Sequence, residues 1–74
     1  MPGRLSESAI EEFKFHLEIL PMWMLHEMQY GFGQTAYHAL FNENLKDQKQ
    51  ERFEHWLSLS TMCCDEMVLR QEAV

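Results

Sequence analysis

The sequence contains few residues that could cross-link the chain or interrupt its helices. Among its 74 residues are two cysteines, two prolines and three glycines. Cys63 and Cys64 are adjacent, and neighbouring side chains of a helix point about 100° apart, so the two thiols cannot close a loop within one chain. We therefore expect reduced cysteines, as in an intracellular protein, and a cytoplasmic location.

Positive charge is also scarce. The chain has 6 Lys and Arg against 12 Asp and Glu, which gives a formal net charge of -6. Neither Lys nor Arg occurs between Lys14 and Lys46. A surface that follows nucleic acid phosphates needs clustered basic side chains. We therefore expect no direct nucleic acid binding, and a protein partner with a basic surface.

No hydrophobic run is long enough to cross a membrane. The most apolar stretch, residues 19–32, contains Pro21 and Glu27 and is preceded by Glu18. A membrane-spanning helix needs about 20 consecutive apolar residues. The N-terminus shows no secretory signal pattern either, because acidic residues precede any apolar run. We therefore predict no contact with a membrane.

Catalytic and nucleotide-binding signatures are missing as well. Gly31 and Gly33 flank a single Phe, without the strand and the further glycine of a dinucleotide-binding loop. Ser58, Ser60 and Thr61 fall within a predicted helix, where hydroxyls usually bond to the preceding turn. We therefore predict a protein that is not an enzyme and has no cofactor.

Helical spacing of apolar residues and helix-end residues predict an all-α chain. Ser8 and Glu11 have the capping-box spacing at the start of a first helix, and Pro21 suits the first position of a second. The glycines at 31 and 33 are expected to end that helix, and Asn44 is expected to cap the last one. The predicted helices span residues 7–20, 21–30, 34–42 and 45–70.

These helices predict one helical domain over residues 1–74, with frayed ends at 1–5 and 71–74. We expect a small bundle of about four helices, antiparallel and dimeric.

Apolar side chains exceed what one small core can enclose. Residues 19–32 contain one Trp, one Tyr, one Phe and three Met, and the helix at 21–30 is predicted to be the buried centre of the bundle. The helix at 7–20 has a core stripe and a second apolar strip that includes Phe15 and Ile19. The surplus predicts association with a twin subunit or another protein.

The last helix also carries two apolar faces. Its core seam is predicted to contain Phe53, Trp56, Leu57, Ser60, Cys63, Cys64 and Met67. His55, Leu59, Met62 and Leu69 are predicted on the opposite face. The residues expected to anchor a partner or a dimer interface are Phe15, Ile19, Trp23, Met24, Met28, Tyr30, Leu59 and Met62.

Together these features predict a small acidic regulator or inhibitor that acts by binding a protein through helical apolar faces. An anti-activator, an antitoxin, an adaptor or a phage-encoded inhibitor would all fit, in a bacterial or viral setting. One alternative is an acidic mimic that blocks a nucleic-acid-binding site. A second alternative is a metal-binding helical protein that uses the four histidines.

The histidines give only a weak metal signal. His16 and His55 each follow a Glu at a spacing of four, which places both side chains of each pair on one helix face. The chain lacks the Glu-x-x-His, His-x-x-x-His and Cys-x-x-Cys spacings of established sites. We therefore assign no metal ligand from the sequence.

Overall fold

The computed structural model describes residues 4–72 of the chain. Over this range the secondary structure is helical, without a β-strand, and the predicted all-α class is confirmed. Residues 4–72 form three α-helices, where the sequence predicts four. The elements are α1 (Glu7–His16), the 3-10 turn η1 (Leu17–Ile19), α2 (Met22–Leu40), the 3-10 segment η2 (Glu43–Gln48) and α3 (Lys49–Glu72).

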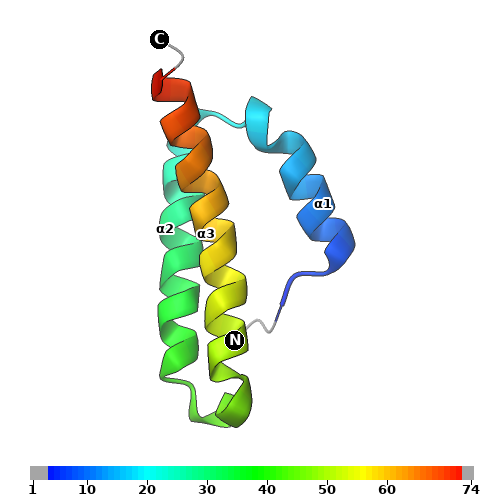
Figure 1. Ribbon diagram of the computed structural model, residues 1–74, viewed down its shortest axis with the longest axis vertical. Coiled ribbons are helices and arrows are strands. Elements are labelled where there is room, and N and C mark those ends of the chain that lie inside the picture. Colours follow the sequence, from blue (N-terminus) through cyan, green and yellow to red (C-terminus); the bar gives the residue numbers. More distant parts are fainter. Residues whose placement is uncertain (1–3, 73–74) are drawn as a thin grey trace.

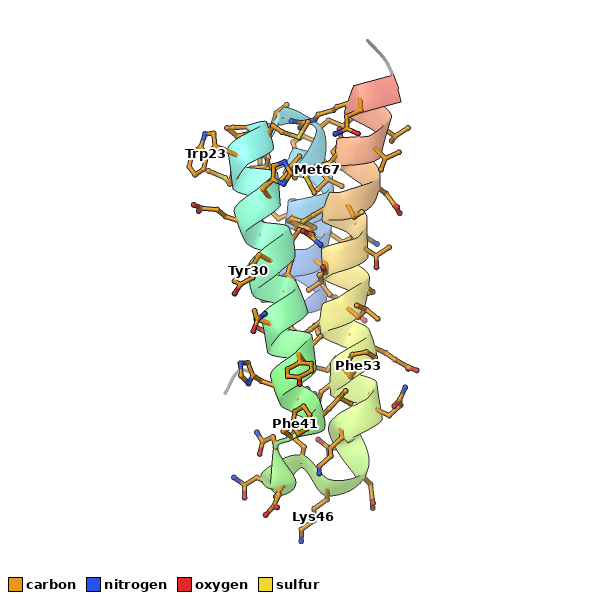
Figure 2. The ribbon with its side chains drawn as sticks, turned by 90° about the vertical axis from the view of Figure 1, so that its left-hand side faces the viewer. Trp23, Tyr30, Phe41, Lys46, Phe53 and Met67 are labelled. Atoms are coloured by element: carbon orange, nitrogen blue, oxygen red, sulfur yellow. The ribbon has the colours of Figure 1, made fainter. Side chains whose placement is uncertain are left out.

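The two long helices form a hairpin. α2 and α3 lie side by side, and the chain reverses direction between them through η2 (Figure 1). α1 lies beside one face of this hairpin in both views, and none of the described residues covers the opposite face (Figures 1 and 2). The molecule is elongated, with extents of 44 × 22 × 15 Å.

α1 is shorter than predicted at its C-terminal end. Ser6 caps its start, because its hydroxyl accepts a hydrogen bond from the Ala9 backbone N–H at 3.1 Å, in place of the predicted Ser8 cap. Leu20 precedes Pro21 and is extended, with ψ 138°. A residue before proline is pushed out of the helical region. The predicted helix at 7–20 therefore ends as α-helix at His16 and finishes as a 3-10 turn.

α2 continues through the two glycines, so the predicted break at residues 31–33 is wrong. Neither Gly31 nor Gly33 has a positive φ. A glycine inside a helix costs only about 1 kcal/mol relative to alanine, and tertiary packing can offset that cost. Phe32 packs into the core between them, and Ser60 of α3 donates a hydrogen bond to the Gln29 carbonyl at 3.0 Å. The segments predicted as helices 21–30 and 34–42 are therefore one helix.

The connection from α2 to α3 delays the start of the last helix. The Asn42 side chain accepts a hydrogen bond from the Asn44 backbone N–H at 3.0 Å, so Asn42 is the capping residue rather than Asn44. Lys46 has a positive φ of 49° and interrupts helical geometry. α3 consequently begins at Lys49, not at residue 45, and extends to Glu72 rather than to residue 70.

A row of aromatic rings joins the three helices. Phe13 of α1 meets Phe32 of α2 edge to face at 5.8 Å, and Phe32 stacks on Trp56 of α3 at 6.1 Å. Both phenylalanines contact the two groups of buried residues, which are Leu25 with Cys63 and Met67, and Ala36 with Trp56 and Leu59. The core is thus continuous along the hairpin, with Phe32 at its middle.

The structure corrects the predicted faces of the last two helices. Leu59 and His55 are buried, whereas Leu57 and Cys64 are exposed, so the core face of α3 is rotated from the predicted seam. Residues 21–30 are predicted to be buried at the centre of the bundle. Leu25 is buried there, but Trp23 and Tyr30 are exposed, so the prediction is wrong for these two residues. A helix packed on one neighbour and only partly covered by a second keeps an outer face in solvent.

The frayed ends predicted for 1–5 and 71–74 lie partly outside the described residues, at 1–3 and 73–74. Of the others, Arg4 and Leu5 contact α3, and Gln71 and Glu72 belong to that helix.

Candidate partner-binding groove

An open apolar groove runs between α1 and α2. Its volume is about 360 Å³, and it is open to solvent along one side. The lining residues are Ala9, Glu12, Phe13, His16 and Leu20 from the N-terminal part of the chain and Met24 and Met28 from α2. We call this feature the α1–α2 groove.

Polar contacts at both ends hold α1 against the hairpin. At the N-terminal end, Arg4 pairs with Glu51 at 2.7 Å, and the Leu5 backbone N–H donates to Nε2 of His55 at 3.2 Å. At the C-terminal end, Arg70 Nη2 donates to the carbonyl oxygens of Leu17 and Glu18, each at 3.1 Å. These contacts attach both ends of the segment that carries α1 to α3.

Between these ends, the segment that carries α1 packs against the core through a few apolar side chains. These are Ile10 and Phe13 of α1, Leu17 of η1, and Leu20. Ala9, His16 and Leu20 lie on the flank toward Met24 and Met28, where no side chain of the described part of the chain fills the groove. The groove therefore results from how far α1 stands from α2.

The walls of the groove suit apolar side chains, and its edge suits a cation. Phe13, Leu20 and the two methionines offer aliphatic, aromatic and thioether surface, and methionine adapts readily to irregular partners. Glu12 and His16 are the ionisable groups among the lining residues, and Glu12 is exposed. The volume lies at the lower end of the range of about 300–1,000 Å³ for binding pockets.

Two of the predicted anchors line this groove, and two more are exposed on the segment that carries its α1 wall. Met24 and Met28 line it. Phe15 is 80% exposed and Ile19 is 73% exposed, each beside a lining residue in the sequence, and the Phe15 ring contacts the His16 ring edge to face at 5.2 Å. Phe15 and Ile19 are thus exposed, but they are not among the residues that line the groove.

The other four predicted anchors are dispersed. Trp23 and Tyr30 are exposed on α2. Leu59 is 1% exposed and belongs to the core, so its assignment to an exposed strip is wrong. Met62 is half-buried against the same core group. Leu59 and Met62 lie on the flank of α3 whose core group also contacts α1 through Ile10 and Phe13, which accounts for their burial.

Two exposed aromatic residues were not predicted as surface anchors. Tyr37 and Phe41 follow Trp23 and Tyr30 along α2 and are exposed like them. The spacing of seven from 23 to 30 and from 30 to 37 would have indicated a common face, but only in a helix that continues through Gly31. The predicted helix break concealed this signal.

His55 is a buried neutral acceptor beneath the N-terminal contact of the α1 segment. Burial lowers the pKa of its imidazole below 6.5, Arg4 and Arg52 lower it further, and Glu51 acts in the opposite direction. Its Nε2 accepts the Leu5 N–H, which requires an unprotonated nitrogen. The contact therefore depends on the neutral form of the ring.

The cysteines and hydroxyls of α3 have structural environments. Burial raises the pKa of the Cys63 thiol, and both cysteines are free. Ser58 donates to the His55 carbonyl and Thr61 to the Leu57 carbonyl, so the predicted bonds to the preceding turn are confirmed for these two residues. Ser60 instead bonds across to α2.

Three further findings bear on the class of protein. Within residues 4–72, His, Cys, Asp and Glu side chains do not gather in groups of three or more that could hold a metal ion. Over the same range, every helix is too short or too polar to span a membrane. Comparison with protein-family models, with curated proteins and with solved structures finds no match to this chain.

Proposed function

We propose that this protein is a small non-enzymatic regulator or inhibitor that binds another protein in the α1–α2 groove. The observation that carries the proposal is an open groove with walls of Phe13, Leu20, Met24 and Met28. Aromatic residues and methionine are enriched in protein interfaces, and an apolar groove between helices commonly receives the apolar side of an amphipathic helix. The free thiols of α3 support the expected cytoplasmic location.

The charges around the groove favour a basic partner. Glu12 lies at the groove, and neither Lys nor Arg occurs from residue 15 to residue 45. The chain as a whole carries a formal net charge of -6. A partner segment with apolar residues on one side and Lys or Arg beside them would place its cations near Glu12. Complementary charge of this kind mainly accelerates association and excludes acidic competitors.

Two exposed apolar residues of the segment that carries α1 would extend the contact. Phe15 and Ile19 project from the α1 side, and their side chains are largely in solvent. A few large side chains commonly supply most of the binding energy of an interface. We therefore assign Phe15, Ile19, Met24 and Met28 to the partner contact.

Site-specific photocrosslinking tests this assignment. A photoreactive side chain replaces Met24 in one variant and Asp65, which is exposed on α3, in a matched control. We expect a discrete adduct with one protein from Met24 and none from Asp65. Phe15→Ser combined with Ile19→Ser should remove that adduct while the helical circular dichroism stays unchanged. Equal adducts from both positions would contradict the proposal.

The acidic mimic makes a different prediction for the captured partner. If carboxylates alone attract a basic groove, complex formation should disappear at about 1 M salt, where charges are screened beyond about 3 Å. A partner held in the α1–α2 groove should remain bound, because burial of apolar surface does not depend on that attraction.

A further inference from the structure

Four aromatic side chains form an exposed line on the outer side of α2. Trp23, Tyr30 and Tyr37 are seven residues apart, and Phe41 follows four residues later. Their exposed fractions are 61%, 68%, 56% and 65%. Seven residues are about two helical turns, so the side chains fall on one face. Figure 2 shows Trp23, Tyr30 and Phe41 spread along α2, with Trp23 and Tyr30 projecting to the left, away from α3. We call these four residues the aromatic stripe.

Contacts among residues 4–72 do not explain this stripe. The rings of Tyr37 and Phe41 touch each other at 4.9 Å, yet both remain more than half exposed. Gly31 is also exposed, and a Cβ built there would meet nothing within 4 Å. Glycine weakens a helix relative to alanine, and the packing of the described residues gives no reason for it at this position. The exposed rings fit a surface that another molecule covers.

We propose that a second copy of this chain covers the aromatic stripe, with the two α2 helices packed in opposite directions about a twofold axis at Tyr30. The spacing is symmetric about that residue, because Trp23 precedes it by seven positions and Tyr37 follows it by seven. The axis places each Tyr30 against its counterpart and each Trp23 against the Tyr37 of the other copy. A seven-residue repeat is the spacing at which two helices keep a continuous seam, and twofold dimers are the commonest assemblies.

The distribution of charge also favours a second copy at this surface. Two chains with a formal net charge of -6 repel each other over most of their surfaces. Apart from its two histidines, α2 carries one ionisable charged residue, Glu27. Contact between two α2 helices therefore brings the copies together where their repulsion is smallest.

The area of the stripe suits a small stable interface. An aromatic side chain buries about 150–250 Å² when fully covered, so the exposed parts of these four rings supply about 400–600 Å² per copy. A specific interface buries about 600–1,000 Å² per partner. The stripe supplies much of this area, and the adjoining exposed surface of Glu27 and Gln34 can add to it. The α1–α2 groove stays open in such a dimer, so the inference does not depend on the proposed function.

Sedimentation equilibrium of the full chain tests the dimer. The monomer has a mass of 8.9 kDa, and we expect a concentration-dependent species of twice that mass. Tyr30→Ser, which changes both sides of the axis, should raise the dissociation constant at least about tenfold. The matched control Phe15→Ser removes an exposed ring from α1 and should leave that constant unchanged. A strictly monomeric protein, or equal effects of the two variants, would overturn the inference.

Disulfide cross-linking tests the direction of the helices. In a Cys64→Ser background, which removes the exposed thiol, Tyr30→Cys should cross-link to itself. Trp23→Cys and Tyr37→Cys should each fail to cross-link alone and should link when the two proteins are mixed. Self-linking of Trp23→Cys, or the absence of any link in the mixture, would overturn the opposite-direction arrangement. The circular dichroism of each variant should match that of the parent, because the substituted side chains are exposed.

Discussion

Substitution of Gly31 by alanine distinguishes a continuous α2 from two helices with a break between them. Gly31 has no positive φ, is exposed, and has open space around the position of a Cβ. An alanine therefore fits without strain. A glycine that ends a helix usually adopts a positive φ instead, and alanine at such a position is destabilising. The two descriptions predict changes in stability of opposite sign.

The stability that Gly31→Ala is expected to add follows from helix propensity. Alanine is more favourable than glycine by about 0.8–1 kcal/mol in an exposed helix interior. For a domain of this size, 1 kcal/mol shifts the melting temperature by about 4–8 °C. Gly33→Ala should also stabilise, but by less, because its Cβ would lie 3.6 Å from the Ser60 hydroxyl and would partly cover that polar group.

Thermal and urea unfolding followed by circular dichroism measure both changes. The measurements are best made in a Tyr30→Ser background, so that any effect of Gly31→Ala on self-association does not enter the unfolding free energy. A melting temperature that rises for Gly31→Ala confirms helical geometry at this residue. A fall of the same size would refute the continuous helix, and with it the common face on which the aromatic stripe depends.

Three further predictions address the core, the N-terminal contact and the turn. Phe32→Ala should lower the free energy of unfolding by about 3–5 kcal/mol, because its ring joins α1 to α3. Urea unfolding measures this change, and a loss below about 1 kcal/mol would contradict the role of the ring. Because the pKa of His55 is lowered on folding, the unfolded chain binds more protons, and stability should fall as the pH drops below 6.5 and level off below the folded pKa. His55→Gln, which keeps an acceptor for Leu5 but does not titrate, should flatten that part of the pH profile in urea unfolding. Lys46→Gly should raise the melting temperature, because only a residue without a Cβ adopts the positive φ at this position freely; an unchanged or lower value would contradict the strained turn.

The sequence predicts the helical class because local patterns set it. The apolar spacing in the stretches that become α1 and α3, and the extended residue required before Pro21, depend on neighbours within a few positions. The continuity of α2 does not depend on such local neighbours alone. Phe32 is held by Phe13 and Trp56, which are distant in sequence, and their packing offsets the local cost of two glycines.

The groove could not be predicted from helical spacing. Met24 and Met28 were recognised as anchors from their composition, but the space they face depends on the distance between α1 and α2. Contacts between residues 47 to 53 positions apart, from Arg4 to Glu51 and from Arg70 to Leu17, set that distance. The burial of Leu59 has a similar cause, because it depends on which flank of α3 receives α1.

The attachment of α1 at its two ends has a consequence for the order of folding. α2 and α3 are joined by a short turn and can pair early, whereas each end of the α1 segment contacts α3 across most of the chain and closes a long loop. α1 should therefore dock last and detach first, at a free energy below that of global unfolding. In native-state hydrogen exchange, the α1 amides should exchange ahead of those in the middle of α2 and α3. The α1 wall of the groove is then less stable than the α2 wall. A partner that binds only when α1 is docked would stabilise the docked state by mass action.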